Sequence, residues 1–127
     1  MKEELKHIYK AFNGKLVGTF AMKVHVCETV AKMPEDIIKK VTKNCWFLGS
    51  MDEAWAFTFT GNDLKDMHLI FISDELLLQE ESQIHYTIAH EIGHVVLEHR
   101  NSTLVKQSKI EIQEQEEEAD IFARKYT

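Results

Sequence analysis

Two histidines and a glutamate in the segment Ala89-His90-Glu91-Ile92-Gly93-His94 have the types and the spacing needed to bind and use a metal ion. On a helix, residues four apart lie on the same face, so His90 and His94 can offer two imidazole nitrogens to one ion. Glu91 lies at the flank of that site, where its carboxylate can accept a proton from a metal-activated water. This HExxH arrangement is typical of zinc enzymes that add water to a carbonyl group.

A helix from about Ser82 to Glu98 must position these side chains. Its apolar residues recur at helical spacing, at Ile84, Ile88, Ile92, Val95 and Val96. Gly93 inside this helix costs about 1 kcal/mol relative to alanine, so we expect a neighbouring element to pack closely against it.

A catalytic zinc ion needs a third protein ligand and one open position. His99 follows His94 by five residues, about 140° around the helix, which places it away from the site. The longer metzincin-type motif would have glycine at position 97 and histidine at position 100. Leu97 and Arg100 stand there instead, which excludes that class.

A better third ligand lies in a second predicted helix, from about Val105 to Tyr126. Glu116 and Asp120 share one face of it with two small residues, Ala119 and Ala123. Glu116 can bind zinc, and Asp120 can accept the second N–H of a zinc-bound histidine and so fix its orientation. The alanines would let the two helices approach each other.

Other glutamates surround this candidate. Glu118 stays open as an alternative third ligand, although it points about 160° away from Asp120 around the helix. Glu114 and Glu117 are better explained as members of a solvated acidic face.

The two motifs together resemble the ImmA/IrrE family of metallopeptidases. The resemblance rests on Tyr86-Thr87-Ile88-Ala89-His90-Glu91-Ile92-Gly93-His94 and on Glu116-x-Glu118-Ala119-Asp120-x-Phe122-Ala123, and it covers roughly residues 68–124. It implies a zincin-like domain in which His90, His94 and Glu116 bind Zn²⁺. It also implies that Glu91 is the catalytic base and that Asp120 supports a ligand.

The same resemblance implies a protein substrate. Members of the family typically cleave helix-turn-helix repressors of bacteria, phages and mobile elements. The strand at 68–72 would then be an exposed edge that pairs with an extended substrate by strand addition. A site of two histidines and one glutamate suits zinc, although manganese or iron could occupy it in vitro.

The sequence patterns along the whole chain predict a single α+β domain over residues 1–127. The sheet is expected to have three or four strands, mostly antiparallel, with the last two helices packed on one face. The expected elements are helices at 2–12 and 34–43, strands at 16–26, 45–48, 55–60 and 68–72, and a turn at Gly61-Asn62-Asp63.

Composition excludes several classes of function. The net charge is −6, which argues against a nucleic-acid binder. Charged residues interrupt every apolar run, and the N-terminus lacks the apolar core of a secretory signal, so we expect a cytoplasmic protein. Cys27 and Cys45 are then expected to be buried free thiols.

Some residues keep two interpretations. Tyr86 lines the site or packs in the core, and His25, His68 and His85 are expected to be surface or satisfied core histidines rather than ligands. No oxyanion-stabilising residue can be named from the sequence. The alternative function is therefore a non-catalytic, peptidase-like binding module in which the metal is structural.

Overall fold

The computed structural model describes residues 1–50, 56–60, 67–99 and 108–127. Its elements confirm the α+β class and most of the expected segments. In chain order they are α1 Glu3–Phe12, β1 Leu16–Val17, α2 Phe20–Ala31, α3 Glu35–Asn44, β2 Cys45–Ser50, β3 Ala56–Thr60, β4 His68–Ser73, a short 3₁₀ turn Leu76–Leu78, α4 Glu81–Val96 and α5 Lys109–Tyr126. The expected turn at 61–63 lies outside the described residues.

The four described strands form one sheet in the order β1-β2-β4-β3. β1 and β4 both run parallel to β2, and only β3 is antiparallel to its neighbour β4. The expectation of a mostly antiparallel sheet was therefore wrong. It assumed that consecutive strands are neighbours, whereas α2 and α3 intervene between β1 and β2, and β4 lies between β2 and β3.

The predicted role of the 68–72 strand as an exposed edge was also wrong. β4 is paired along its length with β2 on one side and β3 on the other. Its run of apolar residues is typical of such a central strand. In the strand order, β3 is the outer strand at this end of the sheet, and α4 contacts it.

The predicted strand at 16–26 is a two-residue strand followed by a helix. The side chain of Thr19 accepts a hydrogen bond from the backbone N–H of Met22 (3.2 Å) and so caps the N-terminus of α2. Met22, Val26 and Val30 are fully buried at helical spacing, while Phe20 is 64% exposed. Packing of this helical stripe overrides the alternating pattern, because β propensity depends strongly on context.

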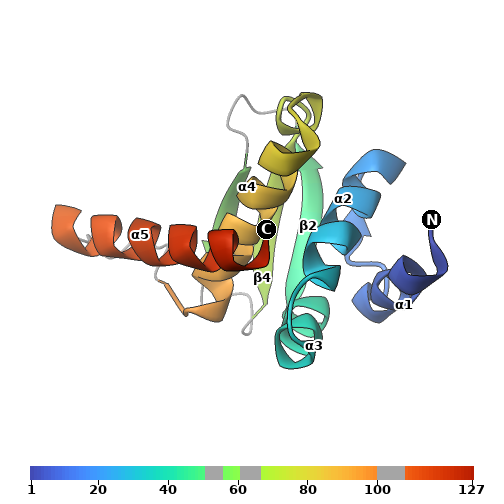
Figure 1. Cartoon of the computed structure of the whole chain (residues 1–127), viewed down its shortest axis with the longest axis horizontal. Helices are drawn as coiled ribbons and strands as arrows, with labels where there is room; N and C mark the ends of the chain where they lie inside the picture. Colours follow the sequence, from blue (N-terminus) through green and yellow to red (C-terminus); the bar gives the residue numbers. More distant parts are fainter. Residues whose placement is uncertain (51–55, 61–66, 100–107) are drawn as a thin grey trace.

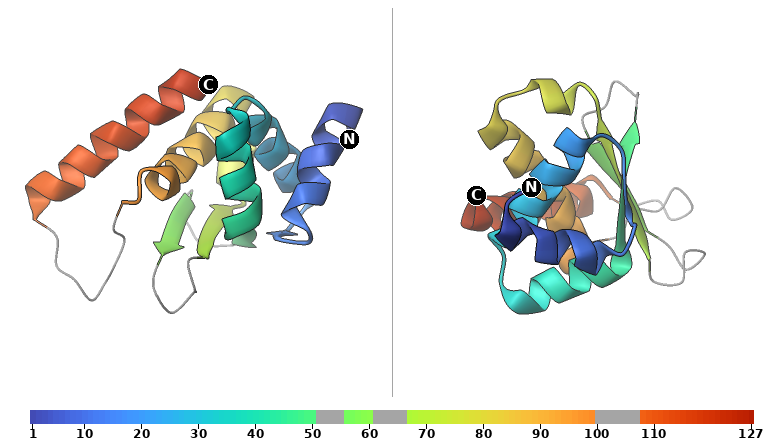
Figure 2. Two further views of the ribbon diagram at one scale, coloured as in Figure 1. Left: turned by 90° about the horizontal axis from the view of Figure 1, so that it is seen from below. Right: turned by 90° about the vertical axis from the view of Figure 1, so that its right-hand side faces the viewer.

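The described helices lie on one side of the sheet (Figures 1 and 2). α4 packs against the sheet and against α2, and α5 crosses α4 and extends beyond it. The core between the helices and the sheet is formed by fully buried residues, which include Phe12, Met22, Val26, Phe47, Ile70, Ile72, Ile88 and Ile92. Among the described residues, no helix has the length and apolar character needed to cross a membrane.

Candidate metal centre

Helix α4 presents the two motif histidines toward α5. Ile88, Ile92 and Val95 are buried in the core and fix the rotation of the helix. His90 and His94 then lie one turn apart on the adjacent face, with ring centroids 4.9 Å apart and each side chain 17% exposed. The apolar periodicity therefore determines the direction in which the histidines point.

Helix α5 brings Glu116 to both histidines. The Nε2 atom of His90 lies 3.2 Å from Glu116 Oε2, and the Nε2 atom of His94 lies 3.1 Å from Glu116 Oε1. Zinc–ligand bonds of 2.0–2.2 Å in a tetrahedron require donor atoms about 3.3 Å apart. The side chains of His90, His94 and Glu116 thus have the donor types and the spacing of a zinc site.

Small residues allow the close approach of α4 and α5. Ala119 and Ala123 on α5 are fully buried. A Cβ atom added to Gly93 would lie only 3.0 Å from Phe122 Cδ1 and 3.3 Å from Phe122 Cβ. The helical glycine, which costs free energy in isolation, is therefore explained by the close packing of Phe122 from α5.

Glu91 lies beside the histidines on α4. Its side chain is 13% exposed, and its Oε1 atom is 4.0 Å from His90 Nδ1. A hydrogen bond with Glu91 raises the pKa of His90, against the opposing effect of burial. The pKa of His94 is lowered, chiefly by burial and also by the neighbouring histidines, against the opposing effect of the neighbouring carboxylates. The site therefore combines candidate metal ligands with a carboxylate able to hold a proton.

Asp120 occupies the same face of α5 one turn after Glu116. It accepts a hydrogen bond from the Tyr86 hydroxyl, and its Oδ2 atom lies 3.1 Å from Arg124 Nε. Burial and the hydrogen bond to Asp120 raise the pKa of Tyr86. The Tyr86 and His90 rings are 6.0 Å apart. Asp120 thus reaches the site through Tyr86, and its predicted bond to a histidine nitrogen stays a prediction.

His99 is a residue that sequence reasoning set aside. Helix α4 ends at Val96, and Glu98 adopts a left-handed backbone conformation with φ of 56°. The chain turns back, the backbone N–H of His99 donates to the His94 carbonyl (2.9 Å), and His99 Nδ1 lies 2.9 Å from His94 Nδ1. His99 is not among the three residues grouped around a possible ion, as predicted, but its contact with His94 could not be predicted from an uninterrupted helix.

This contact can orient His94 as a candidate metal ligand. When Nε2 of His94 binds a metal, its Nδ1–H can donate to Nδ1 of His99 and fix the ring. His99 is 8% exposed, and its Nε2 atom lies 3.7 Å from Glu118 Oε1. Glu118, the alternative third ligand, is thus placed behind His99, whereas Glu116 contacts both motif histidines.

The comparisons with known proteins point to the same part of the chain. Residues 82–127 match the family described as Peptidase U49. The match spans nearly all of α4 and the whole of α5, and so contains His90, Glu91, His94 and Glu116. It supports a peptidase. No curated protein and no solved structure has significant similarity to the chain.

Proposed function

We propose that this protein is a zinc-dependent endopeptidase that cleaves a protein substrate. The observation that carries the proposal is the contact of both Glu116 oxygens with the Nε2 atoms of His90 and His94, with Glu91 next to His90 in the sequence. The similarity to Peptidase U49 supports hydrolysis of a peptide bond. The substrate class, a helix-turn-helix repressor, rests on the resemblance to the ImmA/IrrE family.

In this mechanism, His90, His94 and Glu116 would hold the ion. A bound zinc ion would supply a Lewis acid and lower the pKa of water toward neutrality. Glu91 accepts a proton from the attacking water and delivers it to the leaving amine. His99 holds the His94 ring in orientation through the Nδ1–Nδ1 contact.

The sheet offers a place for an extended substrate. β3 is the outer strand of the described sheet and contacts α4, the helix that carries the motif. A substrate segment added alongside β3 would form backbone hydrogen bonds and run past α4. This assignment replaces the 68–72 strand, both of whose sides are already paired.

The test combines metal analysis with cleavage. We expect Glu116→Ala to contain one zinc ion per chain fewer than the wild type, and Glu91→Gln to contain as many as the wild type. A proteome-derived peptide library, incubated with each protein and analysed by mass spectrometry, should yield new termini only with the wild type. Equal cleavage by Glu91→Gln would remove Glu91 from its role.

The alternative is a non-catalytic binding module with a structural metal. It predicts the same zinc content but no new termini with any variant. A partner captured equally by the wild type and by Glu91→Gln, and released intact, would favour this alternative.

A further inference from the structure

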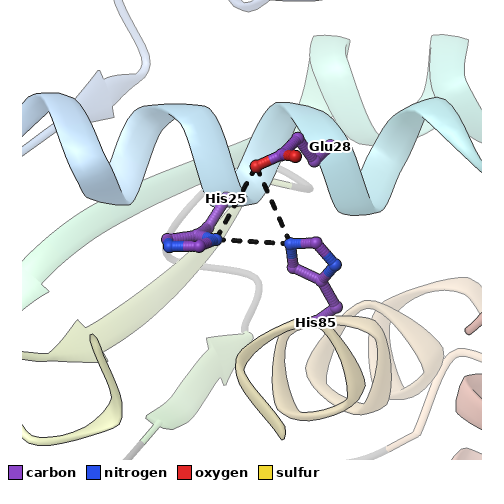
Figure 3. A group of neighbouring side chains, drawn as sticks. All are labelled: His25, Glu28 and His85. Carbon is purple, nitrogen blue, oxygen red and sulfur yellow. Dashed lines mark hydrogen bonds and ion pairs between the residues drawn. The ribbon is translucent and has the colours of Figure 1, made fainter. Parts of the chain in front are cut away.

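A second group of histidine and glutamate side chains lies where α2 packs against α4. His25 and Glu28 come from α2, and His85 comes from α4, five residues before His90 (Figure 3). His25 Nδ1 lies 3.3 Å from His85 Nε2. Glu28 Oε1 lies 3.7 Å from the first of these atoms and 3.9 Å from the second. Three potential donor atoms thus converge on one point between two helices.

The spacing and the chemistry of this group suit zinc. The separation of the two nitrogens equals the roughly 3.3 Å edge of a tetrahedral zinc site, and the carboxylate oxygen needs to move by only a few tenths of an ångström. Burial lowers the pKa of His85, which favours the neutral imidazole that metals bind. His85 is 4% exposed, so its ring is held in place.

A fourth ligand is within reach. Glu81 lies one turn before His85 on α4, with its Oε1 atom 4.0 Å from His85 Nε2, and its exposed side chain can turn toward the three grouped donor atoms. Two carboxylates and two neutral imidazoles would balance the charge of a divalent ion and close a four-ligand site, as in structural zinc sites. A cleft of about 310 Å³, lined by Lys32, Glu81, Ser82, His85 and Thr127, opens beside the group and gives an ion a route of entry.

Lys32 contacts His85 and would have to move when an ion binds. Its Nζ atom lies 3.4 Å from His85 Nδ1, so the ammonium can donate to that nitrogen while His85 Nε2–H donates to His25. Metal at His85 Nε2 would move the ring proton to Nδ1, which faces the ammonium. Lys32 is exposed and can turn away into solvent. Lysine therefore opposes the ion but does not block it.

We propose that His25, Glu28 and His85 form a second Zn²⁺ site, completed by Glu81, that joins α2 to α4. An ion there would cross-link the N-terminal half of the chain to the helix that carries His90 and His94. The site is structural, and it is separate from the proposed catalytic centre because His85 faces α2 while His90 faces α5.

The test titrates Zn²⁺ alone against a chromophoric chelator, in a His94→Gln background that weakens the first site. We expect the His94→Gln protein to bind one ion. Adding His25→Gln or Glu28→Gln should weaken that binding by at least about 100-fold, because loss of a residue that only supports a metal ligand already costs about 10–100-fold. Both changed residues are half-buried and polar, so the fold should tolerate them. Equal thermal unfolding in the presence of chelator confirms this.

Two further variants sharpen the result. His7→Gln, on the exposed face of α1, is the matched control and should leave zinc binding unchanged. Lys32→Gln removes an exposed opposing charge and should tighten binding by about two- to fivefold. Zn²⁺ should raise the melting temperature of the His94→Gln protein but not of the His25→Gln, His94→Gln double variant.

The outcomes separate the two sites. Zinc binding in the His94→Gln background that is unchanged by both His25→Gln and Glu28→Gln overturns the second site, and so does the absence of binding in that background. Retention of the peptidase activity by His25→Gln leaves the proposed function intact. Loss of cleavage in Glu91→Gln says nothing against the second site, because Glu91 is not one of its ligands.

Discussion

Helix α4 carries histidines on two sides, and the two sides differ in what surrounds them. Toward α5, His90 and His94 meet Glu116, with Glu91 adjacent. Toward α2, His85 meets His25 and Glu28, with Lys32 adjacent. A carboxylate beside a metal can transfer protons, whereas an ammonium beside it only opposes the ion's charge. This difference supports the proposals of a catalytic site on the α5 side and a structural site on the α2 side.

Glu91→Gln should have the largest effect, which is a loss of cleavage with zinc binding unchanged on both sides of α4. The amide keeps the shape of the side chain but cannot take up a proton, so cleavage should fall about 10²- to 10⁴-fold. Zinc content on both sides of α4 should stay at the wild-type value, and so should the thermal stability of the protein. Rates of product formation from a cleaved library peptide provide the measurement, and a fall of less than tenfold would contradict the assignment.

Gly93→Val should have the next largest effect, because it should weaken zinc binding on the α5 side of α4 only. Its Cβ would lie 3.0 Å from Phe122 Cδ1, and the larger valine side chain should push Phe122, and with it α5 and Glu116, away from His90 and His94. Overpacking costs about 1–3 kcal/mol of stability. Zinc binding to the α5 side should weaken, while binding to the α2 side should not change. Adding Phe122→Ala should restore part of the lost affinity, and no restoration would show that the contact is not the cause.

His99→Ala should have an intermediate effect. It removes the acceptor 2.9 Å from His94 Nδ1, and loss of such a partner costs about 10–100-fold in metal affinity or activity. Chelator competition for the α5-side ion measures this cost. His99→Asn, which keeps an acceptor, should lose less. Equal losses in both variants would mean that His99 acts only through packing.

Tyr86→Phe should have a smaller effect on zinc binding and cleavage, because it acts mainly on the stability of the fold. It removes the hydrogen bond to Asp120, and one such bond to a charged group contributes about 1.5–3 kcal/mol. Chemical denaturation measures this loss. If cleavage falls by much more than zinc affinity does, the Tyr86 hydroxyl contacts the substrate rather than only positioning Asp120.

Cys27→Ser should have the smallest effect on zinc. Cys27 precedes Glu28, a proposed ligand on the α2 side, but its thiol is buried, and burial raises its pKa to about 11. We therefore expect zinc affinity to stay within about twofold, because the thiolate is the form that binds metals. A larger loss would add Cys27 to the ligands.

The raised thiol pKa values also predict alkaline destabilisation. Burial raises the pKa of Cys45 to about 12, and that of Cys27 to about 11, from an ordinary value of 9.0. The unfolded chain ionises these thiols first. Stability contributed by the neutral thiols is complete below pH 9 and falls as the pH rises from 9 toward 11 or 12. Unfolding midpoints measured over this range should fall less in Cys45→Ala.

Sequence patterns predicted the helical part of the fold better than the sheet. The spacing of Leu5, Ile8 and Phe12 predicted α1, and Pro34 with the two acidic residues after it predicted α3. Both signals depend only on residues close together in the sequence. The 16–26 segment failed, because its alternation fits a strand while tertiary packing selects a helix. The parallel pairing of β2 with β4 joins residues 23 positions apart, and local periodicity carries no information about it.

The sequence by itself determined the α5-side candidate. His90 and His94 lie four residues apart on one helix, so helix geometry places them on the same face. The alanines after Glu116 share its face and allow another helix to approach it. Only the tertiary structure decided the contact of His99 with His94, because it depends on where α4 ends and the chain reverses. The same holds for His25 and His85, which are 60 residues apart and meet only because α2 packs on α4.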